Sequence, residues 1–297
     1  MILRSPPGLW AILFSVRGTM VPRVAGRLSA IAVVSIAAVV AARYHLGLFT
    51  QIGATPLTLI GLALSIFMSF RNNASYDRWW EGRKQWGALL IAERSLARQV
   101  VLLDEEDRRA LLLGVCAFAG GLAAHLRHGD EAGAIARWPV AVDLGAPNLC
   151  DAVLREMGMR GQRLLGEGRL HPMQWLALEE QLVALSAVQA ACERISNTPV
   201  PYAYSLLLHR TAYFFCFCLP FALAGTMGWW SVLPSVLVGY TFFGLDALGD
   251  QIEDPFGTEP NDLPIDAMVR VIERDMLSAL GERDLPPALA PVEGILL

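Results

Sequence analysis

Residues 56–86 read PLTLIGLALSIFMSFRNNASYDRWWEGRKQW, an apolar run that passes without a second proline into a polar one. The apolar part ends at Phe70 and is short for a membrane span, which needs about 20 apolar residues. The polar part is rich in residues compatible with a helix. This stretch therefore predicts one helix that crosses a membrane and continues directly out of it.

Two rows of side chains advance along this run at four-residue spacing, so each row occupies one face of the helix. The small row is Gly61, Ser65 and Ser69. The large apolar row is Leu62, Ile66 and Phe70. Small residues allow close helix packing in a membrane, and several copies of the large row would form a hydrophobic constriction of the kind that gates by dewetting. From spacing alone, contact of the large row with lipid or with another helix is the simpler interpretation.

The composition places the chain in a membrane. Of the 297 residues, 54% are hydrophobic and only 18% are charged, and the mean hydropathy is +0.43. Ordinary soluble domains are about 25% charged, so part of this apolar surface must face lipid. The net charge of −4 and the lack of a clustered basic surface exclude a nucleic-acid partner.

Three further runs are predicted to span the membrane: residues 28–42 with flanks to 48, residues 206–224, and residues 231–248. Basic residues lie before the first span and after the second. They are Arg17, Arg23, Arg27, Arg71, Arg78, Arg83 and Lys84. The positive-inside rule makes that side cytoplasmic, so four spans joined by outer turns at residues 50–55 and 225–230 leave both termini in the cytoplasm.

Between the second and third spans, the pattern becomes that of amphipathic helices, at residues 87–103, 105–127 and 172–194, with shorter helices between 129 and 168. One more follows at 265–280. We therefore predict an all-α chain in four segments: residues 1–86 with two spans, a cytoplasmic helical region at 87–202, two spans at 203–250, and a cytoplasmic end at 251–297. A multi-pass location in the inner cell membrane is expected.

Little in the chain suggests chemistry. The five cysteines form no C-x-x-C pair and are expected to be small buried residues, so we predict no metal, no cofactor and no catalytic residue. His125 and Asp130 have an acyltransferase-like spacing but no second matching block. The acids at the end of the fourth span could line a cation path, or could be solvated span-end acids. They are Asp246, Asp250, Glu253 and Asp254.

Three blocks together resemble the bestrophin family of ion channels. The first is residues 69–86, with Arg78-Trp79-Trp80 eight residues after Phe70; the second is residues 194–210, RISNTPVPYAYSLLLHR; the third is residues 244–262, with the EDPFG run at 253–257. Their order and spacing cover nearly the whole chain. The resemblance implies an all-helical homopentamer around a central pore that runs through membrane and cytosol.

The resemblance also implies roles for particular residues. The family's pore neck falls on Leu62, Ile66 and Phe70, and a second, cytosolic constriction is expected near Met173 or Leu176. Animal members follow the P-F-G turn with an acidic run that clasps calcium. Here residues 258–262 read TEPND, with fewer carboxylates than calcium prefers, so calcium activation is not expected.

The short chain resembles the prokaryotic branch, which implies conduction of monovalent cations such as Na⁺ or K⁺. An anion channel of the same fold is the alternative, and a secondary transporter or a membrane-bound enzyme is a weaker one. A transporter would show inverted repeats and broken spans, and only Pro220 and Pro234 interrupt the spans here. The expected partners are other copies of the chain, membrane lipid and the permeating ion.

Overall fold

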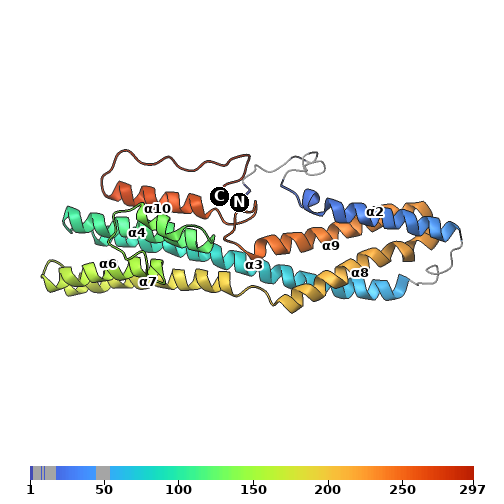
Figure 1. The fold of residues 1–297 in the computed structure, drawn as a ribbon, viewed down its shortest axis with the longest axis horizontal. Helices are drawn as coiled ribbons and strands as arrows, with labels where there is room; N and C mark the ends of the chain where they lie inside the picture. The colour runs from blue at the N-terminus through green and yellow to red at the C-terminus, as the bar shows by residue number, and fades with distance from the viewer. Residues whose placement is uncertain (3–7, 9, 11–17, 45–53) are drawn as a thin grey trace. The chain divides into compact units, whose positions relative to one another are not determined.

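The computed structural model describes the chain except for residues 3–7, 9, 11–17 and 45–53. Arg17, the flank of the first span to residue 48, and most of the predicted turn at 50–55 therefore lie outside the described residues. Apart from isolated β-bridges near the chain ends, every regular element described is helical (Figure 1). The predicted all-α class is confirmed.

The elements follow one another as α2 (Val21–Arg43), α3 (Ala54–Gln99), α4 (Glu105–Leu126), α5 (Glu131–Ala136), α6 (Leu149–Gly166), α7 (Pro172–Asn197), α8 (Tyr202–Met227), the 3₁₀ turn η1 (Gly228–Ser231), α9 (Val232–Glu253) and α10 (Ile265–Ala279). The predicted break at residue 87 is wrong, because α3 continues to Gln99 as one helix of 46 residues. No proline interrupts it after Pro56.

The chain divides into two compact units. The α9 unit comprises Arg4–Arg78 and Pro199–Asp254, and the α4 unit comprises Met1–Leu3, Trp79–Thr198 and Pro255–Leu297. Helix α3 contributes its first part to the α9 unit and its second part to the α4 unit. The four-segment division stays a prediction.

In the α9 unit, α2 packs against both α8 and α9 (Figure 1), and the 3₁₀ turn η1 joins α8 to α9 in the chain. An added Cβ on Gly239 of α9 would overlap the side chain of Ile31, so glycine permits the close approach of α2 and α9 there. Pro220 lies within α8, which continues through it, and Pro234 lies in the first turn of α9, where proline is tolerated. Neither proline breaks a predicted span.

By length and composition, three described stretches are apolar enough to cross a membrane: Val21–Arg43, Glu105–Leu126 and Tyr202–Glu253. The first matches the first predicted span, and the last contains α8, η1 and α9, which match the third and fourth. The second predicted span is not among them, since α3 turns polar after Phe70. Helix α4 is mostly buried within its own unit, so its apolar surface is already covered by protein.

The α4 unit packs α5, α6, α7 and α10 around α4. Its helices begin where the sequence supplies caps. The Asp104 and Asn148 side chains accept hydrogen bonds from the backbone N–H groups of Asp107 and Asp151, which start α4 and α6. His171 and Gln174 form a capping box at the start of α7, next to Pro172 at the first helical position.

Candidate pore lining and a buried charge cluster

The large apolar row of α3 lies on an exposed face of the subunit. Leu62, Ile66 and Phe70 are 61%, 48% and 59% exposed. The opposite face of the same helix is buried through Leu64 and Met68. About half or more of each of these apolar side chains is therefore left uncovered by the rest of the described chain.

The small row divides between two environments. An added Cβ on Gly61 would lie 2.9 Å from the ring of Phe215, so this glycine lets α8 approach α3 closely. Ser65 and Ser69 are exposed, and the Ser65 hydroxyl donates to the carbonyl of Gly61 in its own helix at 2.8 Å. Close packing within the subunit is thus confined to the Gly61 end of the row.

Met173 and Leu176 lie in the first turns of α7 and are also exposed, at 67% and 54%. The capping box at His171 holds the start of this helix. Both side chains are therefore presented from an anchored helix end, and their role in a second constriction stays a prediction.

A buried arginine meets three of the four acids at the end of α9. Arg71 is 1% exposed and belongs to the part of α3 in the α9 unit. Its Nη1 donates to Asp246 Oδ1 at 3.1 Å, and its Nη2 donates to Asp250 Oδ1. Nη2 also pairs with Glu253 Oε2 at 3.4 Å. Because Asp246 is fully buried, its carboxylate needs compensating charge inside the protein, and the Arg71 guanidinium supplies part of it.

Glu253 ties the cluster to the segment that enters α8. Its Oε1 accepts a hydrogen bond from the backbone N–H of Val200 at 3.1 Å, and its backbone carbonyl accepts one from Arg78 Nε at 3.0 Å. Asp254, the C-cap residue of α9, is exposed. Asp246, Asp250 and Glu253 are therefore engaged with cations of the same chain, although Asp250, like Asp254, is exposed.

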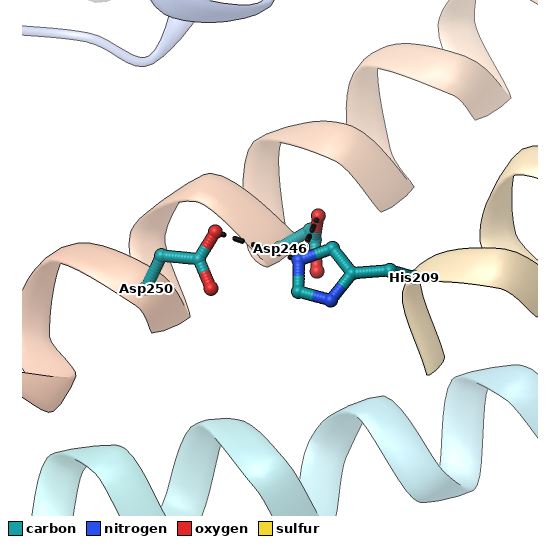
Figure 2. Close-up of side chains that lie close together, drawn as sticks. All are labelled: His209, Asp246 and Asp250. Carbon is teal, nitrogen blue, oxygen red and sulfur yellow. Dashed lines mark ion pairs between the residues drawn. The ribbon is translucent and has the colours of Figure 1, made fainter. Parts of the chain in front are cut away.

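Two further basic residues, His209 and Arg27, approach these acids. Figure 2 shows His209 beside Asp246 and Asp250. His209 on α8 places Nε2 3.2 Å from Asp246 Oδ2 and 3.5 Å from Asp250 Oδ2. Arg27 on α2 places Nη1 3.5 Å from Asp246 Oδ2. The sequence interpretation missed Arg71, Arg27 and His209 as members of this cluster. The sequence feature that could have identified these three residues is a charged or ionisable residue at the end of, or within, an otherwise apolar run.

In the turn that follows α9, backbone carbonyl groups accept hydrogen bonds from side chains of the α4 unit. Trp79 Nε1 donates to the carbonyl of Asn261 at 3.0 Å, and Arg127 Nε donates to that of Phe256 at 3.3 Å. Arg127 also pairs with Asp266. Phe256 is fully buried and lies over Gly82, where a Cβ would approach the ring at 3.1 Å. A guanidinium thus anchors the turn that contains residues 258–262.

The residues set aside as weak catalytic signals have structural roles. Asp130 caps α5 by accepting from the N–H of Gly133 at 2.8 Å, and His125 Nδ1 lies 3.1 Å from Glu131 Oε2. Burial raises the pKa of the Cys192 thiol to about 12, which keeps it protonated. All five cysteines are free, and all but Cys218 are buried, as predicted.

Among the residues that the structure describes, Glu93, a buried carboxyl group in the α4 unit, has no hydrogen bond from an arginine of the kind that Arg71 gives to Asp246. Glu93 on α3 is fully buried, and neither of its carboxyl oxygens makes a hydrogen bond within the described part of the chain. Burial, with a smaller contribution from the charge of Asp275, raises the pKa of Glu93 to about 8. Arg94 Nε lies 3.7 Å away and offsets this only in part, since Arg94 also pairs with Asp275.

We expect Glu93→Gln to remove a pH dependence of stability. The pKa of glutamate in an unfolded chain is about 4.3, so between that value and about 8 the folded state keeps a proton that the unfolded state releases. Stability is therefore lost as pH rises through this window. Each pH unit inside this window costs the wild type up to about 1.4 kcal/mol, so the variant should melt several degrees above the wild type at pH 8, and the gap should close towards pH 5. Melting curves of both proteins from pH 5 to 9 measure this, with the exposed Glu180→Gln as control. A constant gap would contradict the assignment.

Comparison with known proteins agrees over the whole chain. Residues 1–278 match the profile of the family described as Bacterial/Fungal Bestrophin protein. The voltage-dependent anion channel-forming protein mll4386 of Mesorhizobium japonicum is 44% identical over 99% of this chain and 96% of its own length. The voltage-dependent anion channel-forming protein YneE of Escherichia coli K12 is 37% identical over 98% of both chains.

Solved structures give the same result. A bacterial bestrophin homologue from Klebsiella pneumoniae superposes with a TM-score of 0.84 at 35% identity, over 88% of this chain and all of that one. The sequence match, the helical fold and the three sequence blocks agree, and the homologues together with the apolar helices support a membrane location. This chain belongs to the bacterial and fungal bestrophin family.

Proposed function

We propose that this chain is one subunit of a passive channel for monovalent ions, with a preference for anions. Five copies surround a central pore, four helices of each copy span the inner cell membrane, and both termini face the cytoplasm. Family membership supports an ion channel and not an enzyme. The observation that carries the proposal is the exposed apolar row of α3, which lies opposite the buried face of the same helix.

In this proposal the pore neck consists of Leu62, Ile66 and Phe70 from each copy. At 1.5 Å per residue, the row extends over about 12 Å of helix, and a ring of apolar side chains of this length opposes the passage of water and ions unless it widens. Met173 or Leu176 forms a second constriction in the cytosolic part. Both sets are exposed in the single subunit and available to face a common axis.

The preference for anions replaces the cation preference first predicted. An apolar ring does not discriminate by charge, so selectivity depends on charged rings elsewhere. The acids expected to form a cation path include Asp246, Asp250 and Glu253, and these are paired with Arg71 inside the subunit. The relatives from Mesorhizobium japonicum and Escherichia coli are named as anion channel-forming proteins.

The reversal potential of the reconstituted protein tests this proposal. Purified protein in planar bilayers under a tenfold NaCl gradient should give a current whose reversal potential has the sign for Cl⁻, approaching about 59 mV in magnitude for ideal selectivity. Asp254→Asn should leave the sign unchanged. A potential of the opposite sign would restore the cation prediction, and an oligomer that passes no ion under any voltage would overturn the channel itself.

A further inference from the structure

We propose that His209, Asp246 and Asp250 form a binding site for a divalent transition-metal ion, with Zn²⁺ as the representative ion. The three residues lie within the α9 unit, one on α8 and two on successive turns of α9, and their side chains converge (Figure 2). The sequence predicted no metal site, because the five cysteines form no C-x-x-C pair. The donors come together only when α8 packs against α9.

The separations of the donor atoms suit a tetrahedral ion. His209 Nε2 lies 3.2 Å from Asp246 Oδ2 and 3.5 Å from Asp250 Oδ2, and the three donor atoms lie within 4.8 Å of one another. Zinc binds imidazole nitrogen and carboxylate oxygen at about 2.0–2.2 Å, which at the tetrahedral angle places donors about 3.3–3.5 Å apart. A small rotation of Asp250, whose side chain is 40% exposed, completes the triangle.

The imidazole is oriented as a metal ligand is. His209 Nδ1 lies 2.6 Å from the backbone carbonyl of Ser205. A carbonyl only accepts, so Nδ1 carries the proton, and in the neutral ring Nε2 presents its lone pair to the two carboxylates. Metal-binding histidines commonly donate their second ring N–H to a backbone carbonyl in this way, which fixes the tautomer and the plane of the ring.

The two carboxylates are oriented by the same arginine. Asp246 and Asp250 each present Oδ1 to Arg71, which leaves Oδ2 of each directed at the imidazole. Asp246 Oδ2 is buried and makes no hydrogen bond with any described donor. Its contact with Arg27 Nη1, at 3.5 Å, is an ion pair without a hydrogen bond, and that Nη1 also lacks a hydrogen-bond partner among the described residues. A buried acceptor of this kind calls for a ligand.

The donor set selects among metals. One nitrogen and two oxygens are too few for Ca²⁺, which takes six to eight oxygens. They match the three-ligand zinc sites that leave a fourth position to water, and the partial exposure of His209 and Asp250 gives that water access. The competing occupant is a proton on Nε2, which would make His209 a third cation beside Arg71 and Arg27.

Direct metal binding decides between these two occupants. Full-length protein purified without a histidine tag and treated with chelator would be titrated with Zn²⁺ by calorimetry, and with Co²⁺ by visible absorption, which reports tetrahedral coordination. We expect one Zn²⁺ per subunit and a Co²⁺ spectrum of the tetrahedral type. Loss of a single outer-shell partner weakens metal sites by 10–100-fold, so removing a ligand in His209→Gln should weaken binding by about 100-fold.

Matched variants keep the test interpretable. Asp250→Asn removes a second ligand and should also weaken binding. The control is His128→Asn. His128 is exposed on the loop after α4, with φ 54°, so this variant loses an imidazole outside the site and should bind Zn²⁺ like the wild type. Wild-type protein that binds no Zn²⁺ at micromolar concentrations would overturn the proposal, as would equal binding by wild type and His209→Gln. The outcome does not depend on ion conduction, so it is independent of the channel proposal.

Discussion

Arg71→Ala is expected to destabilise the protein by about 3–5 kcal/mol, the cost of removing one partner from a buried ion pair. The side chain is 1% exposed and Asp246 is fully buried, so the variant leaves a carboxylate inside the protein without its main cation. It also frees Asp250 and Glu253 to repel each other. Thermal unfolding of the detergent-solubilised oligomer, followed by size-exclusion chromatography, should show early dissociation or no stable protein.

The control for this experiment is an arginine with a similar partner on the surface. Arg155 pairs with Asp151 one turn away at 2.9 Å, and both side chains are more than half exposed. Exposed pairs of this kind contribute about 0–1 kcal/mol, so Arg155→Ala should unfold within a few degrees of the wild type. If Arg71→Ala were as stable as Arg155→Ala, the buried cluster would not be the support of the α9 unit that its geometry indicates.

The triple variant Leu62→Ala/Ile66→Ala/Phe70→Ala is expected to raise ion flux about tenfold or more. Shorter side chains widen the ring and let water enter it, which lowers the barrier for a hydrated ion. A barrier lower by about 1.4 kcal/mol corresponds to a tenfold rate. Because the three side chains are exposed in the subunit, truncation leaves its internal packing intact. Flux from loaded vesicles and single-channel conductance would both report the change.

A pair of exposed apolar residues elsewhere gives the matched control. Leu233 and Leu237 lie one turn apart on α9 and are 68% and 61% exposed. In the proposed topology they face lipid, so Leu233→Ala/Leu237→Ala should leave conductance unchanged. Equal flux through the wild type and the triple α3 variant would show that Leu62, Ile66 and Phe70 do not form the constriction.

Local sequence patterns were sufficient for the helices and for the faces of α3. Four-residue spacing correctly placed Leu62, Ile66 and Phe70 on one face, and it placed Asp246 and Asp250 on one side of α9, where both meet Arg71. The spacing of residues along a helix does not show which part of the protein, or which solvent, a helix face contacts. The sequence therefore left open whether the acids line a cation path or are solvated at the span end, while their pairing with Arg71 depends on tertiary packing between helices more than 170 residues apart.

The same limit explains the other differences. The predicted break at residue 87 followed a change from polar to amphipathic pattern, but a change in surroundings does not end a helix when no proline or cap is present. His209 was hidden because a single histidine in an apolar run has no partner in the local sequence. The His209 cluster is assembled by the contact of α8 with α9.

The buried arginine also sets an order for biosynthesis. Asp246 is 175 residues after Arg71, and Glu253 is 182 residues after it. At 5–20 residues per second, the ribosome needs roughly 10–35 s to supply the first acid after the arginine has emerged. During that interval, the Arg71 guanidinium must reach interfacial water along its own aliphatic stem. In the proposed topology, the second span takes its final depth only after α9 has been made, so insertion of the nascent chain would be completed in an order that differs from the order of its sequence.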